Sequence, residues 1–204
     1  MYAEALIEKH AIRGGDAADV EKLRAILDGG QRIQRLARDL VTYARPTGST
    51  IEPVDLSGVV DEGLRLAKQA LKEAGAVVLR EPGEAPVVNG NRPSLVQVVL
   101  ALVTNAAQAV ASGGQVRVRL DGADELAMLT VTDDGAGMSD EVRRRAFEPF
   151  FSTKTAVGIG LGLPIVQEIV ERHGGTVSLA SEEGKGTVVV VAIPVHGTGA
   201  YPRR

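Results

Sequence analysis

Residues 131–138 read VTDDGAGM, an apolar strand that runs directly into a pair of glycines. The strand ends on the carboxylate of Asp133, and the glycines follow at alternate positions. Glycines so placed let the backbone approach a flat ligand, and a fixed carboxylate can accept a hydrogen bond from a base amine. A plain turn would use the same residue types, because Asp and Gly dominate turns. The segment therefore predicts a strand end and leaves the ligand open.

A helix expected over residues 92–111 precedes this strand and has two different faces. One face carries an apolar stripe at helical spacing: Leu95, Val99, Leu102, Val103, Ala106 and Val110. The other face brings Thr104, Asn105 and Gln108 together. We expect the stripe to face the core, while the amide face is typical of either a solvated surface or a polar site.

Two further segments follow the strand. Residues 147–154 read FEPFFSTK and contain all three phenylalanines of the chain, and residues 158–163 read GIGLGL and open a helix. A glycine-rich loop at a helix start offers free amides and the positive end of the helix dipole to phosphate groups. The loop matches neither the dinucleotide fingerprint nor a P-loop, because its glycines simply alternate and no Gly-Lys-Ser or Gly-Lys-Thr occurs.

The composition excludes several classes of protein. Cysteine is absent from the 204 residues, which excludes disulfides, thiolate zinc sites and thiol nucleophiles. With 23 basic and 26 acidic residues the chain lacks the basic surface expected of a nucleic-acid-binding protein. Its apolar runs are far shorter than the ~20 residues of a membrane span. We expect a cytoplasmic chain that binds no nucleic acid, with any membrane attachment of the full-length protein lying upstream.

The pattern along the chain predicts three parts: a partial helical hairpin over 1–47, an α/β domain over 51–195 and a flexible tail over 196–204. In the α/β domain we expect helices over 55–74, 92–111, 139–145 and 162–173, and strands over 77–80, 115–121, 127–133, 176–180 and 186–195. Because hairpins mix with crossovers, the predicted fold is a two-layer α/β sandwich whose mixed sheet is covered by helices on one face.

In their order and spacing these segments resemble the catalytic ATP-binding domain of bacterial sensor histidine kinases over about residues 52–194. The boxes of that family correspond here to 97–109, 133–137, 147–151 and 158–162, closed by a Gly-x-Gly-Thr strand at 184–187. The chain is most similar to kinases of the nitrogen-regulation type, whose helix reads Asn-Ala-x-Gln-Ala like residues 105–109. The resemblance implies the Bergerat fold, with ATP between the amide helix and the glycine loop.

The resemblance also implies roles for individual residues. Asn105 would coordinate Mg²⁺ and Asp133 would accept a hydrogen bond from the adenine amine. The other implied nucleotide-binding residues are Gly135, Gly137 and Thr187 around the base, and Gln108, Lys154, Gly158, Gly160, Leu161 and Gly162 around the phosphates. No side chain is assigned to catalysis.

The N-terminal segment resembles the end of the family's dimerisation and phosphotransfer hairpin, but its first histidine does not fit the pattern. His10 is followed by Ala11, where the family places an acidic residue, and by Gly14 and Gly15 soon after. We interpret His10 as a surface histidine and expect the phosphoacceptor upstream or on another chain. His173 precedes two glycines and is expected to cap a helix end.

The resemblance implies an ATP-dependent protein histidine kinase, a transferase that moves the γ-phosphoryl group to a histidine for relay to an aspartate of a response regulator receiver domain. It also implies a homodimer formed through the N-terminal helices. One alternative is a hydrolytic ATPase of the gyrase-like class, which uses a glutamate four residues before the metal-binding asparagine; this chain has Ala101 there. The other is an ATP-binding interaction module without autokinase activity.

Overall fold

The computed structural model describes residues 18–27, 29–30, 50–84, 86–123, 125–153 and 160–197. The chain divides into two compact units, Met1–Arg45 and Pro46–Arg204. In the first unit, residues 18–27 and 29–30 are helical, and Ile26 is largely exposed. Within the described ranges no helix is long and apolar enough to cross a membrane.

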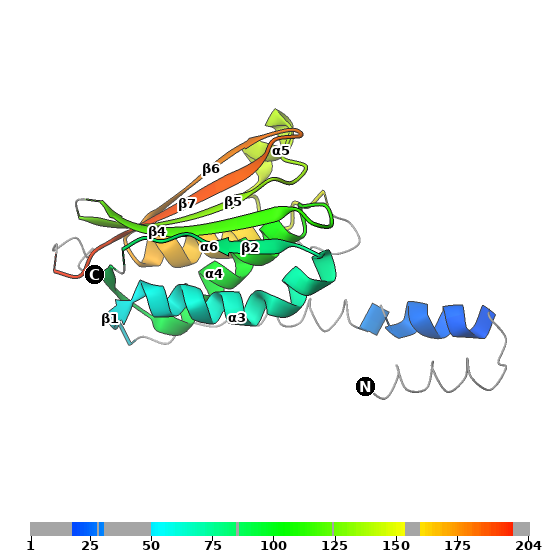
Figure 1. Cartoon of the computed structure of the whole chain (residues 1–204), viewed down its shortest axis with the longest axis horizontal. Helices are drawn as coiled ribbons and strands as arrows, with labels where there is room; N and C mark the ends of the chain where they lie inside the picture. The colour runs from blue at the N-terminus through cyan, green and yellow to red at the C-terminus, as the bar shows by residue number, and fades with distance from the viewer. Residues whose placement is uncertain are drawn as a thin grey trace. The chain divides into compact units, whose positions relative to one another are not determined.

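The second unit is an α/β sandwich of two layers (Figure 1). Its strands are β1 (Glu52–Asp55), β2 (Val77–Arg80), β3 (Val87–Gly90), β4 (Gln115–Ala123), β5 (Leu126–Asp133), β6 (Thr176–Glu182) and β7 (Gly186–Pro194). Its helices are α3 (Leu56–Ala74), α4 (Arg92–Ala107), α5 (Asp140–Arg145) and α6 (Gly162–Arg172).

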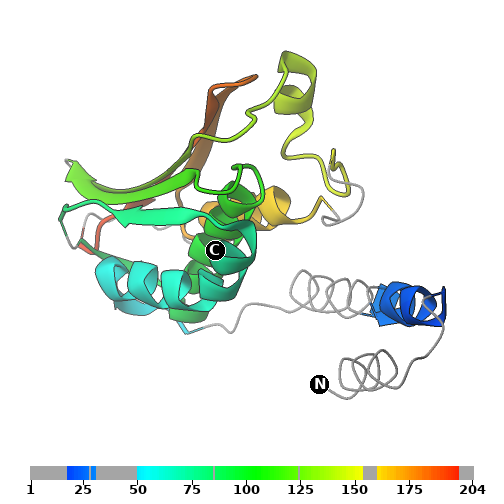
Figure 2. The same cartoon turned by 45° about the vertical axis from the view of Figure 1, so that its right-hand side comes forward.

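The main sheet has five strands in the order β2-β4-β5-β7-β6, in which β2 and β4 run parallel and the other pairs are antiparallel. Helices α3, α4 and α6 pack on one face of this sheet (Figures 1 and 2). The predicted two-layer α/β fold, with a mixed sheet and helices on one face, is confirmed.

The layers form because apolar residues alternate along the strands. In β5, Ala127, Leu129 and Val131 are buried while the residues between them are more exposed. Side chains with this period of two point to one face of a sheet, so they meet the apolar helices there. Burying that face against the helices is the main source of stability.

Helix α4 is buried on more sides than its apolar stripe predicted, and it is shorter. Val96 and Val98, outside the stripe, are buried because α3 and α6 flank the helix on either side. The helix ends at Ala107 rather than at residue 111. The carbonyl of Ala109 instead accepts a hydrogen bond from Ala136 N at 3.0 Å, which ties the helix end to the loop after β5.

Strands β1 and β3 form a separate two-stranded antiparallel sheet that the sequence pattern did not predict. Strand β1 contains Pro53, and β3 ends in Asn89 and Gly90, residue types that are more typical of turns than of strands. The helix expected from residue 55 begins at Leu56, because the side chain of Asp55 caps it by accepting from Ser57 N at 2.9 Å and Gly58 N at 3.3 Å.

A buried histidine connects the C-terminal end of α6 to the N-terminal end of α4. His173 is the C-cap residue of α6, as predicted, and its Nδ1 lies 2.6 Å from Ile169 O. Its Nε2 accepts a hydrogen bond from the backbone N–H of Asn91, the N-cap residue of α4, at 3.0 Å. Because Nε2 must accept, the imidazole is held neutral with its proton on Nδ1.

This arrangement predicts that His173 makes the free energy of unfolding depend on pH. Burial lowers the pKa of His173 below its ordinary value, although the bond to Ile169 O opposes the shift. As the pH falls through about 6.5, His173 becomes protonated in the unfolded chain while it stays neutral in the folded chain, so the free energy of unfolding falls. In His173→Gln we expect a smaller loss of unfolding free energy between pH 7 and pH 5 than in the unaltered chain.

Urea unfolding at several pH values measures this difference. His196→Gln is the control for the loss of one histidine at an exposed position, and its slope is compared with that of His173→Gln. Parallel slopes for His173→Gln and the unaltered chain would contradict the prediction.

Candidate functional site

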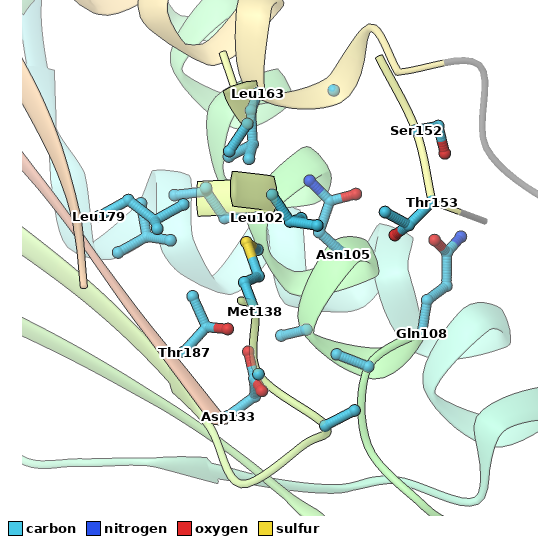
Figure 3. Close-up of a pocket in the computed structure, with 18 of the residues that line it drawn as sticks. Leu102, Asn105, Gln108, Asp133, Met138, Ser152, Thr153, Leu163, Leu179 and Thr187 are labelled. Atoms are coloured by element: carbon cyan, nitrogen blue, oxygen red, sulfur yellow. The ribbon is translucent and has the colours of Figure 1, made fainter. Parts of the chain in front are cut away.

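A pocket of about 470 Å³ lies where α4, the end of β5 and the start of α6 meet (Figure 3). Its volume is within the range of small-molecule sites. Its lining comes from α4 and the residues just after it, β5, helix α5 with the segments before and after it, the first turn of α6 and the hairpin of β6 and β7. Apolar side chains including Leu102, Met138, Leu163 and Leu179 form its middle part, and polar groups gather at two separate ends.

The first polar end is built on β5, the central strand of the sheet. Asp133 is the last residue of β5, is only 7% exposed, and pairs across the sheet with Thr187 of β7. Its Oδ1 accepts a hydrogen bond from Gly135 N at 2.9 Å. Thr187 lies beside it in the pocket and shares a 3.0 Å hydroxyl contact with Ser181. The result is a rigidly held carboxylate acceptor at a wall of the pocket.

The glycines after Asp133 are required by close approach of the backbone. A Cβ on Gly135 would overlap the carbonyl of Ala109, and one on Gly137 would overlap that of Glu182. Gly137 also has a φ of 64°, which favours glycine. Gly137 lines the pocket, whereas Gly135 is buried and supports the turn from behind.

The second polar end carries amides and hydroxyls. Asn105 of α4 and Gln108, the C-cap residue directly after it, face the same side of the pocket as Ser152 and Thr153 (Figure 3). Gly162, the first residue of α6, packs so closely on Asn105 that a Cβ there would lie 3.1 Å from Asn105 Nδ2. This end therefore combines side-chain amides and hydroxyls with the N-terminus of an 11-residue helix.

The start of α6 favours negative charge. The N-cap residue, Leu161, offers no side-chain hydrogen bond to the first turn, and its own side chain is buried in the core. The first amides of a helix need partners and carry the positive end of its dipole. Gly160 and Gly162 line the pocket next to Leu161, whose backbone alone could meet a ligand.

The charged side chains of the described lining are acidic. They are Asp133 and Glu183, and both belong to the first polar end, because the turn that carries Glu183 is bonded to the loop after β5 through Gly184 N and Ala136 O at 2.7 Å. The pocket thus accepts hydrogen bonds at one end and donates them at the other. Such a pocket suits a molecule with an amine-bearing base and an anionic tail.

The three phenylalanines take different positions. Phe151 lines the pocket, Phe147 is half-buried, and Phe150 is 64% exposed with a φ of 65°. A positive φ is rare for a bulky residue, so the surrounding contacts must hold the turn in place.

Several predicted residues come together here and others lie outside the described residues. The structure places Asn105, Gln108, Asp133, Gly137, Gly160, Gly162 and Thr187 in the pocket lining, with Gly135 and Leu161 directly behind it. His10, Lys154 and Gly158 lie outside the described residues. The apolar members Leu102, Met138 and Leu179 were missed as site residues, because in the sequence they look like ordinary core positions.

Residues 90–197 match the family described as histidine kinase-, DNA gyrase B-, and HSP90-like ATPase. The sensor histidine kinase ZraS of Escherichia coli (strain K12) is 32% identical over 196 residues, which cover 96% of this chain and 42% of that protein. The signal transduction histidine-protein kinase AtoS of the same strain is 31% identical over 186 residues, covering 90% and 30%. The chain therefore spans less than half the length of these relatives.

Two solved structures resemble the fold. The mycobacterial sensor histidine kinase MprB is 32% identical with a TM-score of 0.64, over 72% of this chain and 98% of that chain. Full-length ShkA in complex with AMPPNP is 26% identical with a TM-score of 0.71, over 93% of this chain and 41% of that chain.

Proposed function

Because the chain belongs to the histidine kinase-, DNA gyrase B-, and HSP90-like ATPase family, we propose that it binds Mg²⁺-ATP as the catalytic region of a sensor histidine kinase. In this proposal it transfers the γ-phosphoryl group to a histidine, from which the group passes to an aspartate of a response regulator receiver domain. The names of the relatives and the AMPPNP complex of ShkA support it. The observation that carries it is the pocket with an acceptor at one end and donors at the other.

The acceptor end fits the adenine base. The buried carboxylate of Asp133 would accept from the exocyclic amine, with Thr187 beside it and the glycine turn of Gly135 and Gly137 forming the wall. Guanine presents a carbonyl oxygen at that position, which a carboxylate repels. We therefore propose that this end selects adenine nucleotides.

The donor end fits the phosphates and one divalent cation. Mg²⁺ is a hard cation that binds few protein oxygens and keeps several waters, so the amide oxygen of Asn105 together with phosphate oxygens would suffice. Within the described residues no group of three or more His, Cys, Asp or Glu could hold a metal ion by itself. When bound, the cation neutralises charge on the phosphates. Gln108, the amides of Gly160, Leu161 and Gly162, and by sequence Lys154 and Gly158 are the proposed phosphate contacts.

The residues around the donor end favour transfer over hydrolysis. Hydrolysis requires a base that activates water, and the position one helical turn before Asn105 is Ala101. The carboxylates of the described lining, Asp133 and Glu183, belong to the base end. Phosphoryl transfer depends mainly on positioning and charge neutralisation, which the remaining groups provide. The role of these residues is therefore to orient the γ-phosphoryl group toward an imidazole brought by a helix.

The organisation that goes with this function is also a proposal. Residues 1–47 would contribute part of a dimerisation and phosphotransfer hairpin, residues 51–195 the catalytic domain, and residues 196–204 a tail. The protein would act in the cytoplasm as a homodimer.

We expect the chain to bind Mg²⁺-ATP without labelling itself, and to label a separately supplied, intact hairpin of the family weakly. An attacking imidazole nitrogen must lie about 3 to 3.5 Å from the phosphorus, and His10 lacks the acidic neighbour that assists its proton. Incubation with γ-labelled ATP, followed by acid and alkali treatment, tests this. The product should be acid-labile and alkali-stable.

Two outcomes would contradict the proposal at different points. Failure to bind Mg²⁺-ATP in calorimetry would remove the nucleotide site itself. Label on the isolated chain that disappears in His10→Gln would show instead that His10 is the acceptor.

A further inference from the structure

We propose that Arg145 is a positioning residue for the nucleotide, because it fixes the ring of Phe151 as a wall of the pocket. The inference rests on the proposed ATP site and adds to it a residue outside the four sequence boxes. Arg145 is the last residue of α5, and Phe151 lies six residues further on, in the pocket lining.

The guanidinium of Arg145 is held from two sides. Its Cζ lies 4.0 Å from the centroid of the Phe151 ring, within the distance of a cation–π contact. Its Nε donates to Glu148 Oε2 at 2.9 Å. The carboxylate orients the planar group and the ring face receives it, so the position of the ring and that of the guanidinium depend on each other.

The backbone of Phe151 meets the segment that leads into α6. Gly160 packs on it so closely that a Cβ would lie 2.6 Å from Phe151 N, and Gly160 O accepts from Phe150 N at 3.0 Å. Phe151 N in turn donates to Glu148 O at 3.2 Å. The turn that sets the ring therefore also sets the residue before the N-terminus of α6.

This turn needs external support, because Phe150 occupies the left-handed region at a φ of 65°. Such a conformation persists only where neighbouring contacts enforce it. The stack of Arg145 on Phe151 and the bond to Glu148 are contacts of this kind on the α5 side. Without them, we expect the ring to leave the wall for part of the time, and nucleotide affinity to fall.

Helix α5 provides a matched control in Arg143. Arg143 pairs with Asp140 at 2.9 Å, the same distance as between Arg145 and Glu148, and both ion pairs span three residues. The two arginine side chains are similarly exposed, at 43% and 46%. The ring contact belongs to Arg145. Comparing the two alanine variants therefore isolates the ring contact from the charge and helix effects that they share.

The experiment measures Mg²⁺-ATP affinity by calorimetry for Arg145→Ala, Arg143→Ala, Phe151→Leu and the double variant Arg145→Ala/Phe151→Leu. We expect Arg145→Ala to weaken binding about two- to fivefold, as for an exposed cation–π contact. Arg143→Ala should bind like the unaltered chain. In the Phe151→Leu background, Arg145→Ala should have no further effect, because the contact is already gone.

Glu148→Gln provides a second test that leaves the ring and the guanidinium in place. It weakens the anchor of Arg145, so affinity should fall in the same direction as in Arg145→Ala. Melting curves without nucleotide should be alike for Arg143→Ala and Arg145→Ala.

Different results overturn different statements. A loss in Arg145→Ala that persists in the Phe151→Leu background would show that Arg145 acts on the nucleotide directly. An equal loss in Arg143→Ala would assign the effect to the charge of α5. Unchanged affinity in both Arg145→Ala and Glu148→Gln would remove the role of Arg145. Absence of Mg²⁺-ATP binding by the unaltered chain would overturn the proposed function, and with it this inference.

Discussion

Asp133→Asn is expected to weaken Mg²⁺-ATP binding by roughly ten- to a hundredfold, the loss of a charged hydrogen bond of about 1.5 to 3 kcal/mol. The N–H of Gly135 already requires an oxygen at the Oδ1 position, 2.9 Å away. An asparagine there would turn its oxygen to Gly135, so its NH₂ group would take the remaining position. A donor would then face the donor amine of adenine.

Calorimetry with ATP and GTP measures both the affinity and the base preference, which should shrink in the variant. Asp134→Asn is the neighbouring control, because Asp134 is exposed and its Oδ1 accepts from Gln115 N at 2.8 Å, at the start of β4. Unchanged ATP affinity in Asp133→Asn would mean that the base does not lie at the end of β5.

Asn105→Ala is expected to make ATP binding nearly independent of Mg²⁺. The substitution removes the one protein oxygen proposed for the cation, while alanine keeps a strong helix former in α4. ATP affinity should therefore be compared with and without Mg²⁺ in the variant and in the unaltered chain. Thr104→Ala, one residue earlier on α4, is the control and should keep the full response to Mg²⁺. If Mg²⁺ still raised ATP affinity in Asn105→Ala as in the unaltered chain, the assignment of Asn105 would be wrong.

Sequence patterns predicted the fold best where an element carries its own marks, such as a long apolar run or a capping residue at a helix end. Strands β5 and β7 carry long runs rich in apolar residues, and α3 has a capping residue in Asp55 and a glycine at its end in Gly75. The end of α4 was predicted too late, because residues 109–111 remain compatible with a helix. Beyond the helix end, Ala109 O accepts a hydrogen bond from Ala136 N, and this contact joins residues 27 positions apart, which no local pattern shows.

The candidate site divides in the same way. Its polar residues Asn105, Gln108, Asp133 and Thr187 were found because their spacing matches motifs with a chemical purpose. The apolar wall was not predicted, because Met138 and Leu179 look like ordinary apolar core residues in the sequence. Only the folded arrangement shows that they line the pocket. Arg145 was missed for a related reason: three consecutive arginines in a sequence do not show which one lies over a ring.

Helix α6 meets α4 at both of its ends. Gly162 at its beginning lies against the side chain of Asn105 near the end of α4, and His173 at its end bonds to Asn91 at the start of α4. The two helices therefore run antiparallel and are in contact at both ends. Separating the helices to admit a nucleotide would break either the contact of Gly162 with Asn105 or the hydrogen bond from Asn91 to His173. Helices α4 and α6 therefore form the rigid side of the site, and any movement that opens it takes place in the other walls of the pocket.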